Sequence, residues 1–414
     1  MTTVTIPDEK RLRWLLRRSV AEIIPEDEFV AALRSGRCLR LKLGLDPSAP
    51  DLTLGHAVVL RKLRHLQELG HQVVLIVGDW TARIGDPSGQ SQTRPMVSAQ
   101  QVRENAETYL RQLYKVVDEA RTEIRFQSEW YDKFDLETVV RLAARFTVAQ
   151  ILQRDEYSQR FAAHKPIGLH EFLYPLLQAY DSVAVEADVE FGGTDQKFNL
   201  LVGRDLQTMM GQQPQQCFLV PLLVGTDGRV KMSKSLGNYI ALEDPPQEMY
   251  GKVMSLPDDV MMDYYELVTD VPDKELAEIG EALQTRSLNP MEVKMRLARE
   301  IVGQFHSAEA AQAAEDEFTR VFRRRELPEE SAQEVPLQFR GQSSAEFALD
   351  LLIMEHCGLS RSEVRRLIRQ GAIEVDGVPV NDPLDYPRVK AGSIIKVGKR
   401  RFFRIVDADK QSQP

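Results

Sequence analysis

Residues 39–78 read LRLKLGLDPSAPDLTLGHAVVLRKLRHLQELGHQVVLIVG, and this stretch decides the fold. Residues 39–45 alternate in polarity and run into an Asp-Pro pair, which predicts a strand followed by a loop. Residues 54–69 predict an amphipathic helix, and 72–78 form the continuous apolar run of a buried parallel strand. Strand, helix and strand predict a βαβ unit, whose ligands bind at the carboxyl ends of the strands.

Beyond this unit, helical and strand patterns alternate before the chain becomes helical throughout. Helical patterns lie at 98–118, 135–152, 169–182 and 197–210, and strands are expected at 185–191 and 218–224. From about 245 to 325 the pattern is helical alone. The fold class expected is α/β, with a parallel sheet of the Rossmann type in its first domain.

Composition sets outer limits on what the chain can be. With 414 residues, 43% of them hydrophobic and 28% charged, it is expected to form two or three globular domains. Its apolar runs are too short to span a bilayer, and its N-terminus lacks the order of a signal peptide. Three scattered cysteines, without metal-ligand spacing, favour neither a zinc site nor disulfides, so no metal site is expected and the cytosol is the expected compartment. A net charge of −9 argues against a surface that binds nucleic acid throughout.

A lysine loop lies at 231–235, which read KMSKS between two glycine-containing turns. Lysine is a compact cation on a flexible stem, so Lys231 and Lys234 suit a polyphosphate whose charge changes during a reaction. An isolated pair of lysines in a turn is more often an exposed basic turn. The complete pentapeptide is far more specific.

The start of the helix at 54–69 supplies the matching partner. Gly55 has no side chain, so a base or ribose can come close, and His56 can offer a ring N–H to phosphate oxygens beside the helix amides. These residues and the lysine loop resemble the paired HIGH and KMSKS motifs of class I aminoacyl-tRNA synthetases, and the resemblance covers nearly the whole chain. Thr53 stands where the family usually has histidine, and we expect it to support the leaving phosphates by its hydroxyl alone.

Further roles follow from the resemblance. It implies catalytic roles for Lys231, Lys234, His56 and Thr53, and an ATP site made of Asp46, Ser48, Gly55, His56, Gly193, Asp195, Lys231 and Lys234. In the turn at 192–196, Asp195 would take the ribose hydroxyls, Gly193 would let the ribose approach, and Gln196 would meet the substrate carboxylate. Asp86, which follows the second strand, would bind the substrate ammonium, although its Asp-Pro-Ser-Gly context is equally typical of a tight turn.

Tyr174, Gln178 and Asp181 lie on one face of the helix expected at 169–182. A polar stripe is usually solvated, but the leucines around this one indicate burial, so the polar groups need partners. The segment resembles the substrate helix of tyrosyl-tRNA synthetases. The resemblance implies that Tyr174 and Gln178 hold the amino group and that Asp181 accepts the phenolic hydrogen. Lys42 stands where many members have tyrosine; it could meet the phenolic oxygen, pair with Asp181, or point away.

None of these groups is an evident nucleophile or general base. That suits direct attack of a carboxylate on the α-phosphorus of ATP, in which the protein aligns the reactants and neutralises charge. The resemblance implies L-tyrosine, ATP with its Mg²⁺, and tRNA(Tyr) as partners, and a homodimer. Two alternatives are a tryptophanyl-tRNA synthetase and a non-catalytic RNA-binding protein on the same scaffold.

The C-terminal region is basic, with 11 Lys/Arg against 5 Asp/Glu between residues 358 and 406. Residues 359–370 predict an amphipathic helix, and a hairpin signal follows at 373–380. This unit resembles the RNA-binding module named after a ribosomal small-subunit protein. The resemblance assigns RNA contacts to its basic side chains: Arg361, Arg365, Arg366, Arg369, Lys399 and Arg400.

The expected domain order combines these segments. It comprises a Rossmann-type catalytic domain at 1–224, an α-helical domain with the lysine loop at 225–326, a linker at 327–342, a small α+β RNA-binding domain at 343–406 and a tail at 407–414.

Overall fold

The computed structural model describes residues 4–47, 50–88, 98–320, 333–339, 345–346, 349–357, 359–380, 382, 387–398 and 401–411. The chain divides into two compact units, Met1–Gln312 and Ala313–Pro414. No helix within the described ranges is long and apolar enough to cross a membrane.

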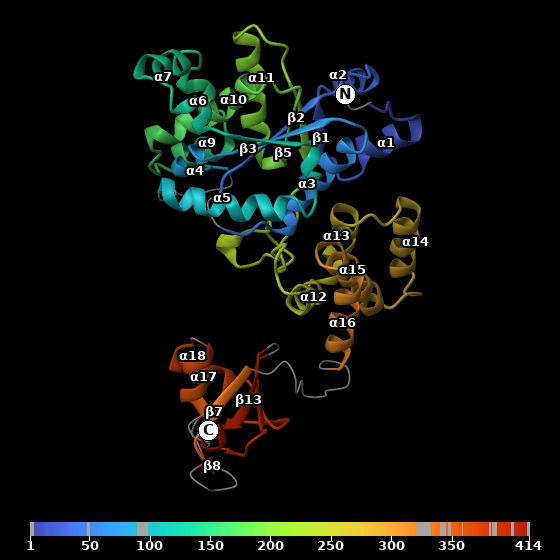
Figure 1. The fold of residues 1–414 in the computed structure, drawn as a ribbon, viewed down its shortest axis with the longest axis vertical. Coiled ribbons are helices and arrows are strands. Elements are labelled where there is room, and N and C mark those ends of the chain that lie inside the picture. The colour runs from blue at the N-terminus through green and yellow to red at the C-terminus, as the bar shows by residue number, and fades with distance from the viewer. Residues whose placement is uncertain are drawn as a thin grey trace. The chain divides into compact units, whose positions relative to one another are not determined.

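A six-stranded sheet lies at the centre of the first unit, in the order β1-β6-β5-β2-β3-β4 (Figure 1). Its strands are β1 Glu22–Ile24, β2 Arg40–Leu45, β3 Gln72–Val77, β4 Thr122–Phe126, β5 Val189–Gly193 and β6 Gln216–Val220. β1 pairs antiparallel with β6, and the other neighbours pair in parallel. The predicted βαβ unit is confirmed as β2, α3 (Leu54–Gln67) and β3, with Arg40–Leu45 paired residue for residue to Gln72–Val77.

Helices cover both faces of this sheet (Figure 1). Besides α3, the helices of this part of the chain are α1 Glu9–Arg17, α2 Glu26–Arg34, α4 Thr81–Ile84, α5 Ala99–Leu113, α6 Ser128–Tyr131, α7 Leu136–Ala143, α8 Val148–Ile151, α9 Asp155–Ala162, α10 Tyr174–Ala184 and α11 Lys197–Met209, with short 3₁₀ turns at Glu119–Arg121, Leu169–Leu173 and Thr194–Gln196. Several predicted elements differ in their bounds. The helix expected at 135–152 is divided into α7 and α8, and the strand expected at 218–224 is β6, which ends at Val220. The helix expected from 169 starts as a 3₁₀ turn because Pro175 sits in the first turn of α10, and the strand expected from 185 begins at 189 because Val185 still caps α10.

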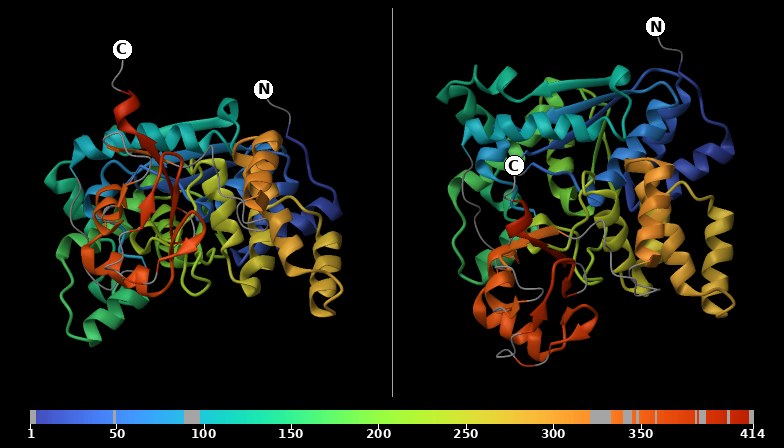
Figure 2. Two further views of the ribbon diagram at one scale, coloured as in Figure 1. Left: turned by 90° about the horizontal axis from the view of Figure 1, so that it is seen from below. Right: turned by 60° about the horizontal axis from the view of Figure 1, so that its bottom comes forward.

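A helical bundle follows β6 and the lysine loop, as expected from the sequence (Figure 2). It consists of α12 Pro246–Met254, α13 Met261–Val268, α14 Asp273–Gln284 and α15 Pro290–Phe305, with a 3₁₀ turn at Asp258–Val260, and α16 Ala308–Phe318 comes next. A further 3₁₀ turn, Lys234–Leu236, begins within the lysine loop. Arg18, at the end of α1, ties the bundle to the sheet domain because its guanidinium donates to the carbonyls of Tyr265 and Glu266 at 2.9 and 2.7 Å.

The second unit holds a five-stranded sheet in the order β10-β9-β12-β13-β7 and a two-stranded pair, β11-β8. Its elements are β7 Gln333–Leu337, β8 Ala345–Glu346, α17 Leu349–Cys357, α18 Arg361–Arg369, β9 Ile373–Val375, β10 Val378–Pro379, β11 Arg388–Val389, β12 Ile394–Val397, β13 Arg401–Asp407 and α19 Ala408–Gln411. The predicted hairpin is confirmed by the antiparallel pairing of β9 with β10.

Part of the segment expected to be a linker is a strand. β7 pairs in parallel with β13 and buries Val335. Pro336 made this stretch look unstructured, but proline is tolerated on an edge strand, and β7 is at the edge of its sheet. The segment expected to be a tail likewise contains the end of β13 and α19.

Candidate active site

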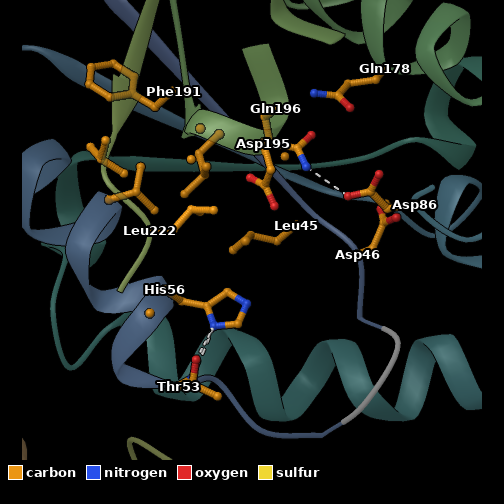
Figure 3. A pocket seen from close by; sticks show the side chains of 18 of the residues that line it. Leu45, Asp46, Thr53, His56, Asp86, Gln178, Phe191, Asp195, Gln196 and Leu222 are labelled. Atoms are coloured by element: carbon orange, nitrogen blue, oxygen red, sulfur yellow. Dashed lines mark hydrogen bonds between the residues drawn. The ribbon is translucent and has the colours of Figure 1, made fainter. Parts of the chain in front are cut away.

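A cavity of about 310 Å³ opens at the carboxyl ends of β2, β5 and β6 and at the N-terminus of α3. Figure 3 shows side chains from these separate segments directed into it. The predicted site residues that line it are Asp46, Thr53, Gly55, His56, Asp86, Tyr174, Gln178, Asp181, Gly193, Asp195, Gln196, Lys231 and Lys234. Ser48 lies outside the described residues, and Lys42 is not in the lining.

Thr53 and His56 form a closed pair at the start of α3 (Figure 3). His56 Nδ1 accepts from the Thr53 backbone N–H at 3.2 Å and lies 2.9 Å from the Thr53 hydroxyl oxygen. Burial, followed by the charge of Lys234, lowers the pKa of His56 to about 3, so the ring is neutral at pH 7. Because Nδ1 accepts, the ring proton resides on Nε2, which is the nitrogen left to donate.

This pairing changes the interpretation of Thr53. Its hydroxyl, which the sequence analysis assigned to the leaving phosphates, meets the imidazole instead. Threonine at this position therefore fixes the orientation of His56, and this indirect role needs no positive charge.

The lysine loop reaches the cavity with both of its cations. Lys231 Nζ lies 2.7 Å from Asp195 Oδ2, and Lys234 Nζ donates to the Asp51 carbonyl at 2.7 Å and to the Tyr109 hydroxyl at 2.8 Å. Tyr109, on α5, has no motif around it that would have predicted its place in the site. The loop backbone is held by Asn238, whose side-chain oxygen accepts from the Ser233 N–H at 2.8 Å.

Backbone hydrogen bonds fasten the segment that follows this loop to the entry of α3. The Leu54 N–H donates to the Ile240 carbonyl at 3.0 Å, and the Leu242 N–H donates to the Leu52 carbonyl at 2.9 Å. On the other side, Met232 N–H donates to the Leu223 carbonyl at 2.8 Å. These hydrogen bonds thus link the backbones around the two motifs, which are distant in the sequence.

Asp181 is buried at the cavity wall and is held by three donors. These are Gln127 Nε2 at 2.7 Å, the Tyr131 hydroxyl at 3.0 Å and Trp130 Nε1 at 3.2 Å. Burial raises the pKa of Asp181 to about 7, which hydrogen bonds and the charge of Lys42 partly oppose. The three donors come from the segment after β4, which no sequence signal connected to the site.

Asp46 is a second buried carboxylate in the cavity. It accepts from the Thr81 hydroxyl at 2.6 Å and from the Tyr174 hydroxyl at 2.9 Å. Burial raises the pKa of Asp46 to about 7, and the hydrogen bond from Thr81 opposes this shift. Gly78 is required beside it, because a Cβ there would collide with the Asp46 carboxylate.

Asp86 and Gln196 are hydrogen-bonded to each other, with Gln196 Nε2 2.9 Å from Asp86 Oδ2 (Figure 3). The buried Arg154 supports both of them: it donates to Asn199 Oδ1 at 3.0 Å, and Asn199 donates to Gln196 Oε1 at 3.0 Å. The Nη2 atom of Arg154 lies 3.7 Å from Asp86 Oδ1. Arg154 could not be predicted from the sequence, because nothing in its own segment marks it as part of the site.

Lys42, which the resemblance placed near the tyrosine site, is not in the lining of the cavity. Its ammonium has three hydrogens, and three protein oxygens take them: Glu190 Oε1 at 2.9 Å, the Gln178 carbonyl at 2.8 Å and Ser182 Oγ at 2.7 Å. Among the open alternatives, the structure favours the one in which Lys42 points away from the substrate.

In the second unit, Val364 and Ile368 bury one side of α18, and Arg361, Arg366 and Arg369 lie on its exposed side. Arg361 pairs with Asp350 at 2.9 Å. Lys399 and Arg400 lie outside the described residues. Across the described ranges, no group of three or more His, Cys, Asp and Glu side chains is placed to hold a metal ion.

The chain is similar to known proteins over nearly its whole length. The family described as "tRNA synthetases class I (W and Y)" matches residues 34–323, and the S4 domain family matches 353–384. The tyrosine–tRNA ligase of Dehalococcoides mccartyi (strain CBDB1) is 56% identical over 398 residues, which cover 96% of this chain and 99% of that protein. The tyrosine–tRNA ligase of Thermotoga maritima is 48% identical over 391 residues, or 94% of this chain and 96% of that protein.

Solved structures show the same fold at low identity. A C-terminally truncated mitochondrial tyrosyl-tRNA synthetase of Aspergillus nidulans superposes with a TM-score of 0.64 at 22% identity, covering 76% of this chain and 95% of that chain. The L-tyrosine complex of the Archaeoglobus fulgidus enzyme gives a TM-score of 0.60 at 24% identity, covering 74% and 99%. By its family match and its full-length relatives, the chain belongs to the class I tRNA synthetases of the W and Y family, with an S4 domain near its C-terminus.

Proposed function

We propose that this chain is a tyrosine–tRNA ligase, which activates L-tyrosine with ATP and transfers the tyrosyl group to the 3′-terminal ribose of tRNA(Tyr). The observation that carries the proposal is one cavity that joins Asp181, the Asp86–Gln178 wall and both lysines of the lysine loop. Relatives 48–56% identical over nearly the whole chain bear this name.

Tyrosine binds through its phenol and its ammonium, which meet different polar side chains of the cavity. The phenol of tyrosine donates to Asp181, and the ammonium is bound by Asp86, Tyr174 and Gln178. Phenylalanine would leave the buried Asp181 without this partner, and an unmade hydrogen bond at a buried group is costly. Gln196 meets the substrate carboxylate.

Activation proceeds by attack of the tyrosine carboxylate on the α-phosphorus, with pyrophosphate leaving. When ATP binds, the ion pair between Lys231 and Asp195 separates. Asp195 then contacts the ribose hydroxyls, and Lys231 contacts the phosphates. Lys234 and the Nε2–H of His56 add positive charge and a donor where negative charge develops. Mg²⁺ enters with ATP, bound through phosphate oxygens.

The acceptor is tRNA, held partly by the S4 domain. Arg366 and Arg369, on the exposed side of α18, are placed to contact phosphates, which makes the affinity for tRNA strongly dependent on salt.

Cys38, Cys217 and Cys357 are free thiols, which suits the cytosol as the proposed compartment.

A second copy of this chain is the proposed subunit partner. Between residues 136 and 169 the surface carries a group of exposed large apolar side chains, here called the apolar patch: Leu136, Val140, Val148, Phe161 and Leu169. Leu136 and Leu169 are 80% and 83% exposed, and large apolar side chains left exposed to solvent are typical of interaction surfaces.

Amino-acid-dependent pyrophosphate exchange tests the function. We expect exchange with tyrosine and none above background with phenylalanine. Exchange with tryptophan in place of tyrosine would identify the tryptophan enzyme, and absence of exchange with all three would contradict the proposal. Charging of tRNA(Tyr) transcripts then tests the second step.

A further inference from the structure

Lys42 and Glu190 form a buried ion pair directly behind the cavity. They are register partners on the neighbouring strands β2 and β5, their side chains are 0% and 1% exposed, and Lys42 Nζ lies 2.9 Å from Glu190 Oε1. A buried charge is tolerated only when it is paired and hydrogen-bonded. Both of these charges meet that condition, although neither contacts the space where substrate binds.

Glu190 completes its hydrogen bonds with three further donors. They are Gln178 Nε2 at 3.1 Å, Ser182 Oγ at 3.1 Å and Gln215 Nε2 at 2.5 Å. Lys42 in turn donates to the Gln178 backbone carbonyl at 2.8 Å. Gln178 is therefore held by the pair at both its backbone and its side chain.

The contact with Glu190 decides which way the Gln178 carboxamide faces. A carboxylate only accepts, so the amide nitrogen must point to Glu190, and Oε1 is the end left for the cavity. Oε1 accepts from Asn199 Nδ2 at 3.0 Å and keeps a second lone pair. Gln178 and Asp86 lie on the same side of the cavity (Figure 3), where an ammonium would need acceptors rather than donors.

We infer that Lys42 and Glu190 are positioning residues that hold the Gln178 carboxamide with its oxygen toward the substrate ammonium. Lys42 pairs with the Glu190 carboxylate at 2.9 Å, and this carboxylate, which only accepts hydrogen bonds, excludes the flipped amide. Glutamine at position 190 could itself donate to Gln178 Oε1 and so permit the flip. The inference rests on the proposed tyrosine specificity, because it assigns the ammonium subsite of that substrate.

Three ligands separate this role from a general structural one. Tyramine keeps the ammonium of tyrosine and lacks the carboxylate, whereas 3-(4-hydroxyphenyl)propionate keeps the carboxylate and lacks the ammonium. For Glu190→Gln we expect the dissociation constants of tyrosine and tyramine to rise about tenfold or more, as befits a hydrogen bond to a charged group. The constant for 3-(4-hydroxyphenyl)propionate should change less than about twofold.

Kinetics give a second readout. In pyrophosphate exchange, Glu190→Gln should raise the KM for tyrosine while the KM for ATP stays within about twofold. Lys42→Met should act in the same direction, and the double variant should be no worse than the poorer single variant, because the two residues act as a unit. Glu171→Gln is the matched control, since Glu171 is a buried carboxylate paired with Arg160 at 2.6 Å and does not line the cavity.

Each outcome has a defined meaning. Equal weakening of all three ligands by Glu190→Gln, or no weakening of any, would overturn the inference while leaving tyrosine activation intact. Failure of the wild-type chain to bind tyrosine would instead overturn the proposed function. If Glu190→Gln does not fold, the same three ligands are compared in Ser182→Ala. Smaller changes in the dissociation constants are expected there, because Ser182 is hydrogen-bonded to both Lys42 and Glu190.

Discussion

Lys231 is bound to Asp195 across the cavity, 2.7 Å from Nζ to Oδ2, so the lysine loop and the turn after β5 meet through one ion pair. The two partners are expected to serve different parts of ATP, the phosphates and the ribose. We therefore expect nucleotide binding to separate them, so that the cation becomes available to the phosphates only as the ribose takes its place on Asp195.

Replacing either lysine of the loop should affect chemistry more than binding of the amino acid. Lys231→Met or Lys234→Met is expected to slow adenylate formation by about 100-fold or more, because charge developing on the phosphates loses a fixed partner. The tyrosine dissociation constant should stay within about twofold. Single-turnover kinetics and equilibrium dialysis measure the two quantities, with Lys252→Met as control, since Lys252 pairs with Asp244 outside the cavity. Equal losses in both would refute the assignment.

Thr53→Val should slow pyrophosphate exchange about fivefold, which corresponds to the loss of one hydrogen bond of about 1 kcal/mol. The physical reason is that His56 loses the hydroxyl beside Nδ1 that fixes its ring. Thr53→Ser retains the hydroxyl and should retain the rate. An unchanged rate in Thr53→Val would show that the backbone N–H alone orients His56.

Asp181 makes the stability of the fold depend on pH, and the sign of this dependence follows from its raised pKa. Its folded pKa of about 7 lies above the ordinary value of 3.8, so between these values the folded state holds more protons than the unfolded state. The contribution of Asp181 to stability is thus complete below about pH 4 and is lost as the pH rises through about 7. Asparagine mimics the neutral acid, so the Tm of Asp181→Asn minus that of the wild type should increase from pH 5 to pH 8, as scanning calorimetry can measure. A difference that is constant or decreases with pH would contradict this sign.

Phe161→Asp should produce a monomer. Phe161 is 66% exposed in the apolar patch, and a charge there would have to be buried if a second copy covers it. Light scattering measures the mass, and Met291→Asp, on α15 outside the patch, provides the control. A dimer that survives in Phe161→Asp would place the interface elsewhere.

Arg366→Ala and Arg369→Ala should each weaken tRNA binding and reduce the slope of log affinity against log salt by about 1, because one phosphate contact is lost. Pyrophosphate exchange should be unaffected. Filter binding across a salt series measures the slope, and Lys274→Ala, an exposed lysine on α14, serves as the control. An unchanged slope in both arginine variants would remove α18 from the RNA surface.

Local patterns predicted the elements that carry the site, and distant pairings decided its details. The βαβ unit, the helix start at Gly55-His56 and the lysine loop could be found because each is encoded within a few residues. The surroundings of Lys42 could not, because its partner Glu190 comes from another strand and meets it only when β2 and β5 pair. The alternation of polarity in β2 predicts which side of the sheet Lys42 faces, but it cannot predict that a carboxylate lies on that side.

The same limit applies to the donors around Asp181 and to β7. Trp130 and Tyr131 carry no motif, and only the packing of their helix against α10 makes them part of the site. In β7, Pro336 and polar neighbours suggested a linker, because edge strands tolerate residues that central strands exclude. A single sequence shows the residue types of a strand but not its place in the sheet.

The backbone hydrogen bonds between 52–54 and 240–242 have a practical consequence for reading mutants. They join the entry of α3 to the segment that follows the lysine loop through main-chain atoms, which every substitution other than proline retains. Variants of His56, Lys231 or Lys234 therefore keep this main-chain connection. Their kinetic losses reflect the contacts of the replaced side chain, which for Lys234 include its bond to the Asp51 carbonyl.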